Sequence, residues 1–155
     1  MGKRLDDLRF FKESCDQGTW KIFKEFPEDQ LDYRPFEGMM TFAEQIHHLA
    51  LAERLVMSQV AKSIGLEQKF SDVQSASDLN GQMQELQKTW LISGQVLNQM
   101  KDDDLDRDVV FPERNIKSSA GKLVAAMIEH SVHHRGEIIV YFRALGKEPP
   151  RRWSD

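Results

Sequence analysis

Residues 123–145, LVAAMIEHSVHHRGEIIVYFRAL, carry apolar side chains at every third or fourth position. This spacing puts those side chains on one face of an α-helix and predicts a helix over residues 119–145 with a buried inner side. The residues that share the face are Leu123, Met127, His130, His134, Ile138, Tyr141 and Leu145. Two histidines therefore interrupt an otherwise apolar stripe.

Three earlier segments, residues 5–26, 42–64 and 78–100, have the same helical spacing, whereas the alternating stretches typical of half-buried strands are almost absent. Four helices of similar length joined by long, unequal connections predict an all-α four-helix bundle. The length of 155 residues suits one domain over residues 1–155, and 40% hydrophobic residues are enough for a core without disulfides.

Two local patterns refine this outline. Thr41 and Glu44 fit the S/T-x-x-E capping box, in which each side chain bonds to a backbone N–H at a helix start, so the second helix is expected to begin here. It should end at Gly65, because glycine tolerates the left-handed conformation of a helix C-terminus. Between the third and fourth helices, the short apolar run at residues 109–111 predicts an isolated extended piece.

Composition excludes several classes of protein. The formal charge of -4 comes from 21 basic and 25 acidic side chains spread along the chain, which gives no electrostatic reason to expect nucleic acid binding. The first ten residues, MGKRLDDLRF, lack the apolar run of a signal peptide, and no later stretch could cross a bilayer, so a cytoplasmic protein is expected. The single cysteine, Cys15, agrees with a reducing compartment and is expected to be buried rather than nucleophilic.

All five histidines fall in two clusters, His47 with His48 and His130 with His133 and His134. Positions four apart on a helix lie roughly 6 Å apart along its axis, so His130 and His134 have the spacing of metal ligands. A core histidine can instead bond to a backbone carbonyl, but two in one apolar stripe favour a metal site, because unpaired polar groups in a core are costly. His133 is rotated about 100° from His134 and is expected at the rim. His47 and His48 flank the buried face of their helix equally, so periodicity does not choose between them.

Two segments carry a resemblance to a known family. They are TFAEQIHHLALAER (residues 41–54) and EHSVHHRGEIIVYFRALGKEPP (residues 129–150), and the most specific element is the H-x-x-H-H-R-G pattern at residues 130–136. Together they resemble the paired motifs of the DinB-like superfamily, also called YfiT-like or bacillithiol-transferase-like bundles. The loop PEDQLDYRPFEG (residues 27–38) is also similar to the segment that joins the first two helices in that family.

This resemblance implies a particular set of metal ligands. A three-histidine site lies inside the bundle in that family, and the matching positions here are His48, His130 and His134. The resemblance therefore favours His48 over His47. Glu137 stands where the family usually has glutamine, so a carboxylate at this position would add charge or an outer contact to the site.

Three neutral imidazoles leave a divalent ion its full charge and an open position, as in catalytic metal sites. Imidazole suits several transition metals, of which we expect zinc or nickel. The resemblance implies a metal-dependent transferase that activates a low-molecular-weight thiol such as bacillithiol for attack on electrophilic small molecules. The alternatives are a metal-dependent hydrolase that uses water as its nucleophile and a non-catalytic stress-response bundle.

Further residues are secondary candidates for binding. Arg135, Arg143 and Glu137 are candidates for contacts to a cofactor or an anionic substrate, although solvent-facing arginines are the commoner outcome. The resemblance also implies a homodimer. Phe111 and Trp153 are apolar residues outside the predicted helices that either serve such an interface or cover the core.

Overall fold

The computed structural model describes residues 3–151 and contains four long α-helices within that range. Trp153 lies outside the described residues. Three short 3-10 turns and a small hairpin lie between the helices. In chain order the elements are α1 (Lys3–Phe23), η1 (Glu28–Gln30), α2 (Phe42–Ser63), α3 (Leu79–Gln99), η2 (Asp102–Asp106), β1 (Asp108–Phe111), η3 (Pro112–Arg114), β2 (Ile116–Ser119) and α4 (Ala120–Ala144).

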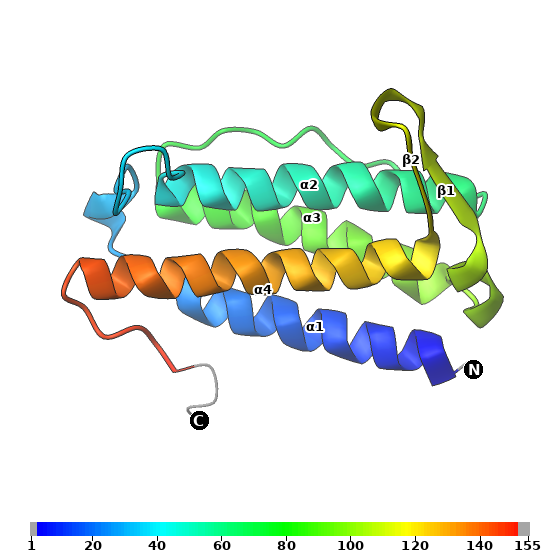
Figure 1. The fold of residues 1–155 in the computed structure, drawn as a ribbon, viewed down its shortest axis with the longest axis horizontal. Helices are drawn as coiled ribbons and strands as arrows, with labels where there is room; N and C mark the ends of the chain where they lie inside the picture. The colour runs from blue at the N-terminus through cyan, green and yellow to red at the C-terminus, as the bar shows by residue number, and fades with distance from the viewer. Residues whose placement is uncertain (1–2, 152–155) are drawn as a thin grey trace.

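The four helices pack side by side as a bundle, which confirms the predicted fold class (Figure 1). α1 packs against α3 and α4, and α2 packs against the same two helices. The connection over residues 64–78 returns along the length of α2, so α2 and α3 run in the same direction, and α1 and α4 run together in the opposite one (Figure 1). Among the described residues, no helix combines the length and apolar character needed to cross a membrane.

The ends of α2 follow the predicted local chemistry. The Thr41 hydroxyl accepts from the Glu44 backbone N–H at 3.2 Å, and the Glu44 carboxylate accepts from the Thr41 N–H at 2.6 Å, which confirms the capping box. Gly65 follows the helix with φ of 77°, and the next N–H, of Leu66, bonds back to the Ala61 carbonyl at 2.9 Å. This left-handed ending satisfies carbonyls that the helix itself leaves free.

The first helix ends earlier than expected. α1 stops at Phe23, and tight backbone turns join Glu25 to Ile22 and Phe26 to Phe23. Pro27 explains the difference, because a proline disfavours helical backbone at the residue before it. The Phe26 ring is nevertheless buried, and it stacks on Phe42 with centroids 3.8 Å apart.

The predicted extended piece at residues 109–111 is real, but it is not isolated. It forms β1, which pairs antiparallel with β2 so that Phe111 lies opposite Ile116 and Asp108 opposite Ser119. Val109 and Phe111 point inward and pack with the core, whereas Val110 is exposed. The structure therefore gives Phe111 the role of covering the core.

The buried side chains form two apolar clusters, one toward each end of the bundle. One contains Ile22, Phe42, Leu86 and Tyr141, and the other contains Met57, Val60, Val96 and Val124, with further residues in each. Between them, near the middle of each helix, lies a set of buried or half-buried polar side chains. This polar layer consists of Lys12, His48, Glu53, Ser93, His130, Ser131 and His134.

Candidate metal centre

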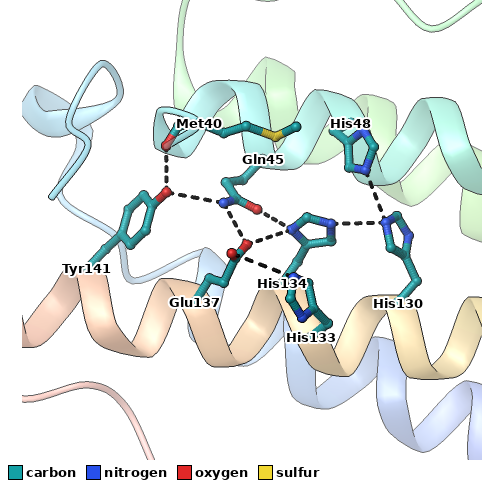
Figure 2. A network of polar contacts seen from close by, with 8 residues as sticks. All are labelled: Met40, Gln45, His48, His130, His133, His134, Glu137 and Tyr141. Atoms are coloured by element: carbon teal, nitrogen blue, oxygen red, sulfur yellow. Dashed lines mark hydrogen bonds and ion pairs between the residues drawn. The ribbon is translucent and has the colours of Figure 1, made fainter. Parts of the chain in front are cut away.

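Three histidines from two helices converge in the polar layer (Figure 2). His48 comes from α2, and His130 and His134 come from successive turns of α4. The Nε2 atom of His130 lies 3.1 Å from Nε2 of His48 and 3.0 Å from Nε2 of His134. One nitrogen from each ring lies within 4.8 Å of the others. The sequence-predicted set is therefore brought together at one point.

The environment keeps two of these rings neutral near pH 7. Burial, together with the neighbouring charge of His130, lowers the pKa of His134 to about 4. Burial and the neighbouring His48 also lower the pKa of His130 below its ordinary value. Neutral imidazoles have an unshared electron pair on one nitrogen, which is the form that binds metal ions.

The donor set fits a divalent transition metal. A tetrahedral ion with nitrogen ligands at about 2.0–2.1 Å holds those nitrogens about 3.3 Å apart. The observed Nε2 separations of 3.0 and 3.1 Å are close to that value. Three converging nitrogen lone pairs would repel one another without a cation or a proton between them, so the arrangement suits a bound ion.

The other two histidines do not join this cluster. His47 lines a second hollow, beside Arg34 and Met39, which His48 also borders, and the Nδ1 atom of His47 is buried without a hydrogen bond. The His133 side chain is 63% exposed, as expected of a residue at the rim. Its ring meets the His134 ring edge to face at 5.0 Å, and its Nε2 lies 3.6 Å from Glu137.

His134 has a second set of contacts on the ring nitrogen that faces away from the cluster. Its Nδ1 atom lies against the side-chain oxygen of Gln45 and 3.0 Å from a carboxylate oxygen of Glu137. Glu137 therefore reaches the site, in contact with a candidate ligand, and does so from the next turn of α4. Contacts of this kind orient a metal-binding histidine and raise its basicity.

An open hollow of about 760 Å³ adjoins the histidine cluster between α2 and α4. His48, His130 and His133 line its polar part, and most of its remaining wall is apolar. The apolar wall comprises Leu51, Ala52, Leu55, Val56, Ala126 and Met127. Such a hollow gives a small molecule with an apolar body direct access to the two half-buried imidazoles.

The two candidate arginines lie elsewhere. Arg135 is buried against α1, where its guanidinium donates to the Cys15 carbonyl at 3.3 Å and contacts the Thr19 hydroxyl at 3.5 Å. Arg143 is exposed on α4, nine residues beyond His134. The cationic residue that does line the hollow is Arg114, in the turn of the hairpin. Cys15 is buried, as expected, and burial raises the pKa of its thiol.

The sequence did not predict a role at the site for two residues that lie beside it. Gln45 is almost fully buried on α2, and Tyr141 is fully buried on α4. A signal for Gln45 was present, because a polar residue three positions before His48 lies on the same helix face. Tyr141 has the spacing of an ordinary core residue, and nothing in that spacing distinguishes its hydroxyl.

Comparisons with solved structures agree with the four-helix fold. The YfiT protein of Bacillus subtilis has a similar structure, with a TM-score of 0.78 and 19% identity over 96% of this chain and 91% of that one. It is described as a probable metal-dependent hydrolase with an unusual four-helix bundle topology. The DinB-like protein YjoA of Bacillus subtilis also matches in structure, with a TM-score of 0.63, 23% identity and 97% of each chain covered.

The sequence comparisons point to the same group of proteins. YjoA of Bacillus subtilis strain 168, described as uncharacterized, is 24% identical over 130 residues, which cover 83% of this chain and 82% of the relative. The model of the DinB superfamily matches residues 13–138, a span that includes all three converging histidines. This chain belongs to the DinB superfamily.

Proposed function

We propose that this chain is a metal-dependent transferase that activates a low-molecular-weight thiol, such as bacillithiol, for attack on an electrophilic small molecule. The observation that carries the proposal is the convergence of three imidazoles at the wall of an open, mainly apolar hollow, where Nε2 of His130 lies 3.1 Å from Nε2 of His48 and 3.0 Å from Nε2 of His134. His48, His130 and His134 would hold the ion, for which zinc or nickel is the expected choice.

A divalent ion held by neutral imidazoles keeps its full charge and lowers the pKa of a thiol or water bound to it. The residues of this chain supply the rest of the site. Gln45 and Glu137 orient His134. Leu51, Leu55 and Met127 provide an apolar surface that accommodates the body of an electrophile and excludes water from it.

The test combines metal content with turnover. Purified protein, loaded with zinc or with nickel, is mixed with a thiol and a haloaromatic compound or an epoxide, and loss of the electrophile is followed. We expect thiol-dependent consumption that is abolished in His130→Ala together with ion binding. His47→Ala is the matched control and should keep both properties, because His47 is not part of the three-histidine group. Retained turnover in His130→Ala would refute the proposal.

A second candidate is a metal-dependent hydrolase that uses water as the nucleophile at the same three histidines. The description of YfiT as a probable metal-dependent hydrolase favours it. The requirement for a thiol distinguishes the two activities, because hydrolysis of an ester or amide proceeds without added thiol. Thiol-independent hydrolysis that is lost in His130→Ala, with no transfer activity, would select the hydrolase.

A further inference from the structure

A line of polar contacts runs from the start of α2 to the histidine cluster (Figure 2). The Tyr141 hydroxyl donates to the backbone carbonyl of Met40. The Gln45 amide nitrogen lies 3.1 Å from the Tyr141 hydroxyl oxygen and 2.8 Å from a carboxylate oxygen of Glu137. The Gln45 side-chain oxygen contacts Nδ1 of His134. Three side chains, Tyr141, Gln45 and Glu137, therefore link a backbone carbonyl to a candidate metal ligand.

The chemistry of each group fixes the direction of these bonds. The Met40 carbonyl can only accept, so the single hydroxyl hydrogen of Tyr141 is used there. The hydroxyl oxygen then accepts one N–H of Gln45, and the carboxylate of Glu137 accepts the other. With both amide hydrogens used, the Gln45 group that faces His134 is its carbonyl oxygen. A carbonyl only accepts, so Nδ1 of His134 must carry the hydrogen.

We propose that Tyr141 and Gln45 are positioning residues that hold His134 as the Nδ1–H tautomer. In this tautomer the unshared pair is on Nε2, the atom 3.0 Å from His130 in the cluster. If the Gln45 amide were turned over, its N–H would face Nδ1, and the ring hydrogen would move to Nε2 and block that nitrogen. The inference rests on the proposed function only where it treats Nε2 of His134 as a ligand.

Burial strengthens the effect of these hydrogen bonds on the His134 tautomer. Tyr141 is 0% exposed, Gln45 2% and His134 5%, so solvent does not compete for the bonds between them. A bond that is lost in such surroundings leaves a polar group unpaired, which is costly. Glu137 provides a second acceptor, 3.0 Å from the same Nδ1, so the ring N–H is shared between two oxygens. Both neighbours of Nδ1 therefore favour the same tautomer.

The test reads the tautomer directly. Metal-free protein with ¹⁵N-labelled histidine is examined by long-range ¹H–¹⁵N NMR, which distinguishes the protonated from the unprotonated ring nitrogen. We expect His134 as Nδ1–H in the wild type and an increased share of the Nε2–H tautomer in Tyr141→Phe, which keeps the ring but removes one of the two acceptors that fix the Gln45 amide. Gln45→Leu, which removes the amide, should weaken zinc binding about 10–100-fold, and Tyr141→Phe should weaken it about 10-fold.

Tyr33→Phe is the matched control. The Tyr33 ring packs against the Tyr141 ring with centroids 6.2 Å apart, so this variant removes the hydroxyl of a neighbouring ring without removing any of the bonds described above. It should retain wild-type tautomer and zinc affinity. If Tyr141→Phe keeps His134 as the Nδ1–H tautomer, the proposal is overturned, whatever the affinity of the variant for zinc. If the tautomer changes but the affinity for zinc does not, the positioning role is overturned. Absence of zinc and nickel binding in the wild type would refute the proposed function but leave the tautomer measurement valid.

Discussion

His47 and His48 are adjacent in sequence but differ in their surroundings. His48 places Nε2 3.1 Å from Nε2 of His130, whereas His47 is not part of the three-histidine group. Neighbouring residues on a helix point about 100° apart, so one of this pair faces α4 and the other does not. We expect His48→Ala to lose stoichiometric zinc or nickel and His47→Ala to retain it, as measured by elemental analysis of purified protein. Equal ion content in the two variants would contradict this assignment.

The sequence alone predicted some residues of the site but not others. The spacing of His130 and His134 within an apolar stripe was enough to select both, because two imidazoles four residues apart meet on one helix face. His48 was selected over His47 by family resemblance, since both flank the apolar face equally. The contact between Gln45 and Tyr141 could not be predicted, because the two residues are 96 positions apart and meet only when α2 packs on α4.

At the scale of the helices, a buried ion cluster joins α1 to α2, which lie on opposite sides of α4 in Figure 1. The Lys12 ammonium lies 2.5 Å from Asp16 and 2.9 Å from Glu53, and Lys12 and Glu53 are both almost fully buried. We expect Lys12→Met to lower the free energy of unfolding by about 3–5 kcal/mol, because it leaves buried carboxylates without their cation. Urea denaturation followed by circular dichroism measures the change.

Lys88 supplies the control for that measurement. Its ion pair with Glu85 lies on α3, and the Lys88 side chain is 62% exposed. Exposed pairs contribute about 0–1 kcal/mol, so Lys88→Met should leave the unfolding curve nearly unchanged. If the two lysine variants were equally stable, the buried cluster would have no structural role.

The elements themselves were predictable where the pattern is local. Helical periodicity and the capping box specify α2 from its own residues, and the same periodicity reveals α1, α3 and α4. The hairpin was only half predicted. β1 has inward-facing Val109 and Phe111, but β2, with the sequence IKSS, has no buried residue and becomes a strand only through its pairing with β1. A strand defined by its partner gives little signal of its own.

For the molecule as a whole, the buried acids and histidines make stability depend on pH in opposite directions. Burial raises the pKa of Asp16 from 3.8 to about 7, against the opposing charge of Lys12 and with the added charge of Glu53. Between these values the folded chain binds more protons at Asp16 than the unfolded chain does, so stability falls as pH rises. His134, with its pKa lowered from 6.5 to about 4, has the opposite effect, and its contribution is lost as pH falls.

Asp16→Asn separates the two effects. We expect this variant to lack the decline in stability between about pH 4 and pH 7 that Asp16 causes, so the difference between wild type and variant should change steadily across that window. Urea unfolding at half-unit pH intervals provides the measurement. A difference that is constant with pH would show that Asp16 has the same affinity for protons in the folded and unfolded chain.

An ion at the three histidines would also link helix α2 to helix α4. His48 belongs to α2 and the other two ligands to α4, and all three lie where one apolar cluster gives way to the other. An ion that binds only the folded chain stabilises it by mass action, by about 4 kcal/mol at 1,000 times its Kd. For a chain of this length, each kcal/mol raises Tm by roughly 2–4 °C.

Wild-type protein should therefore unfold roughly 8–16 °C higher when zinc or nickel is present at 1,000 times its Kd than after treatment with a chelator. The gain should be absent in His48→Ala, which removes the ligand on α2 and leaves two on α4. His133→Ala should keep the gain, because this mostly exposed ring is outside the cluster. A Tm that rises equally in all three proteins would place the ion elsewhere, since loss of the interhelical ligand must weaken an ion bound between α2 and α4.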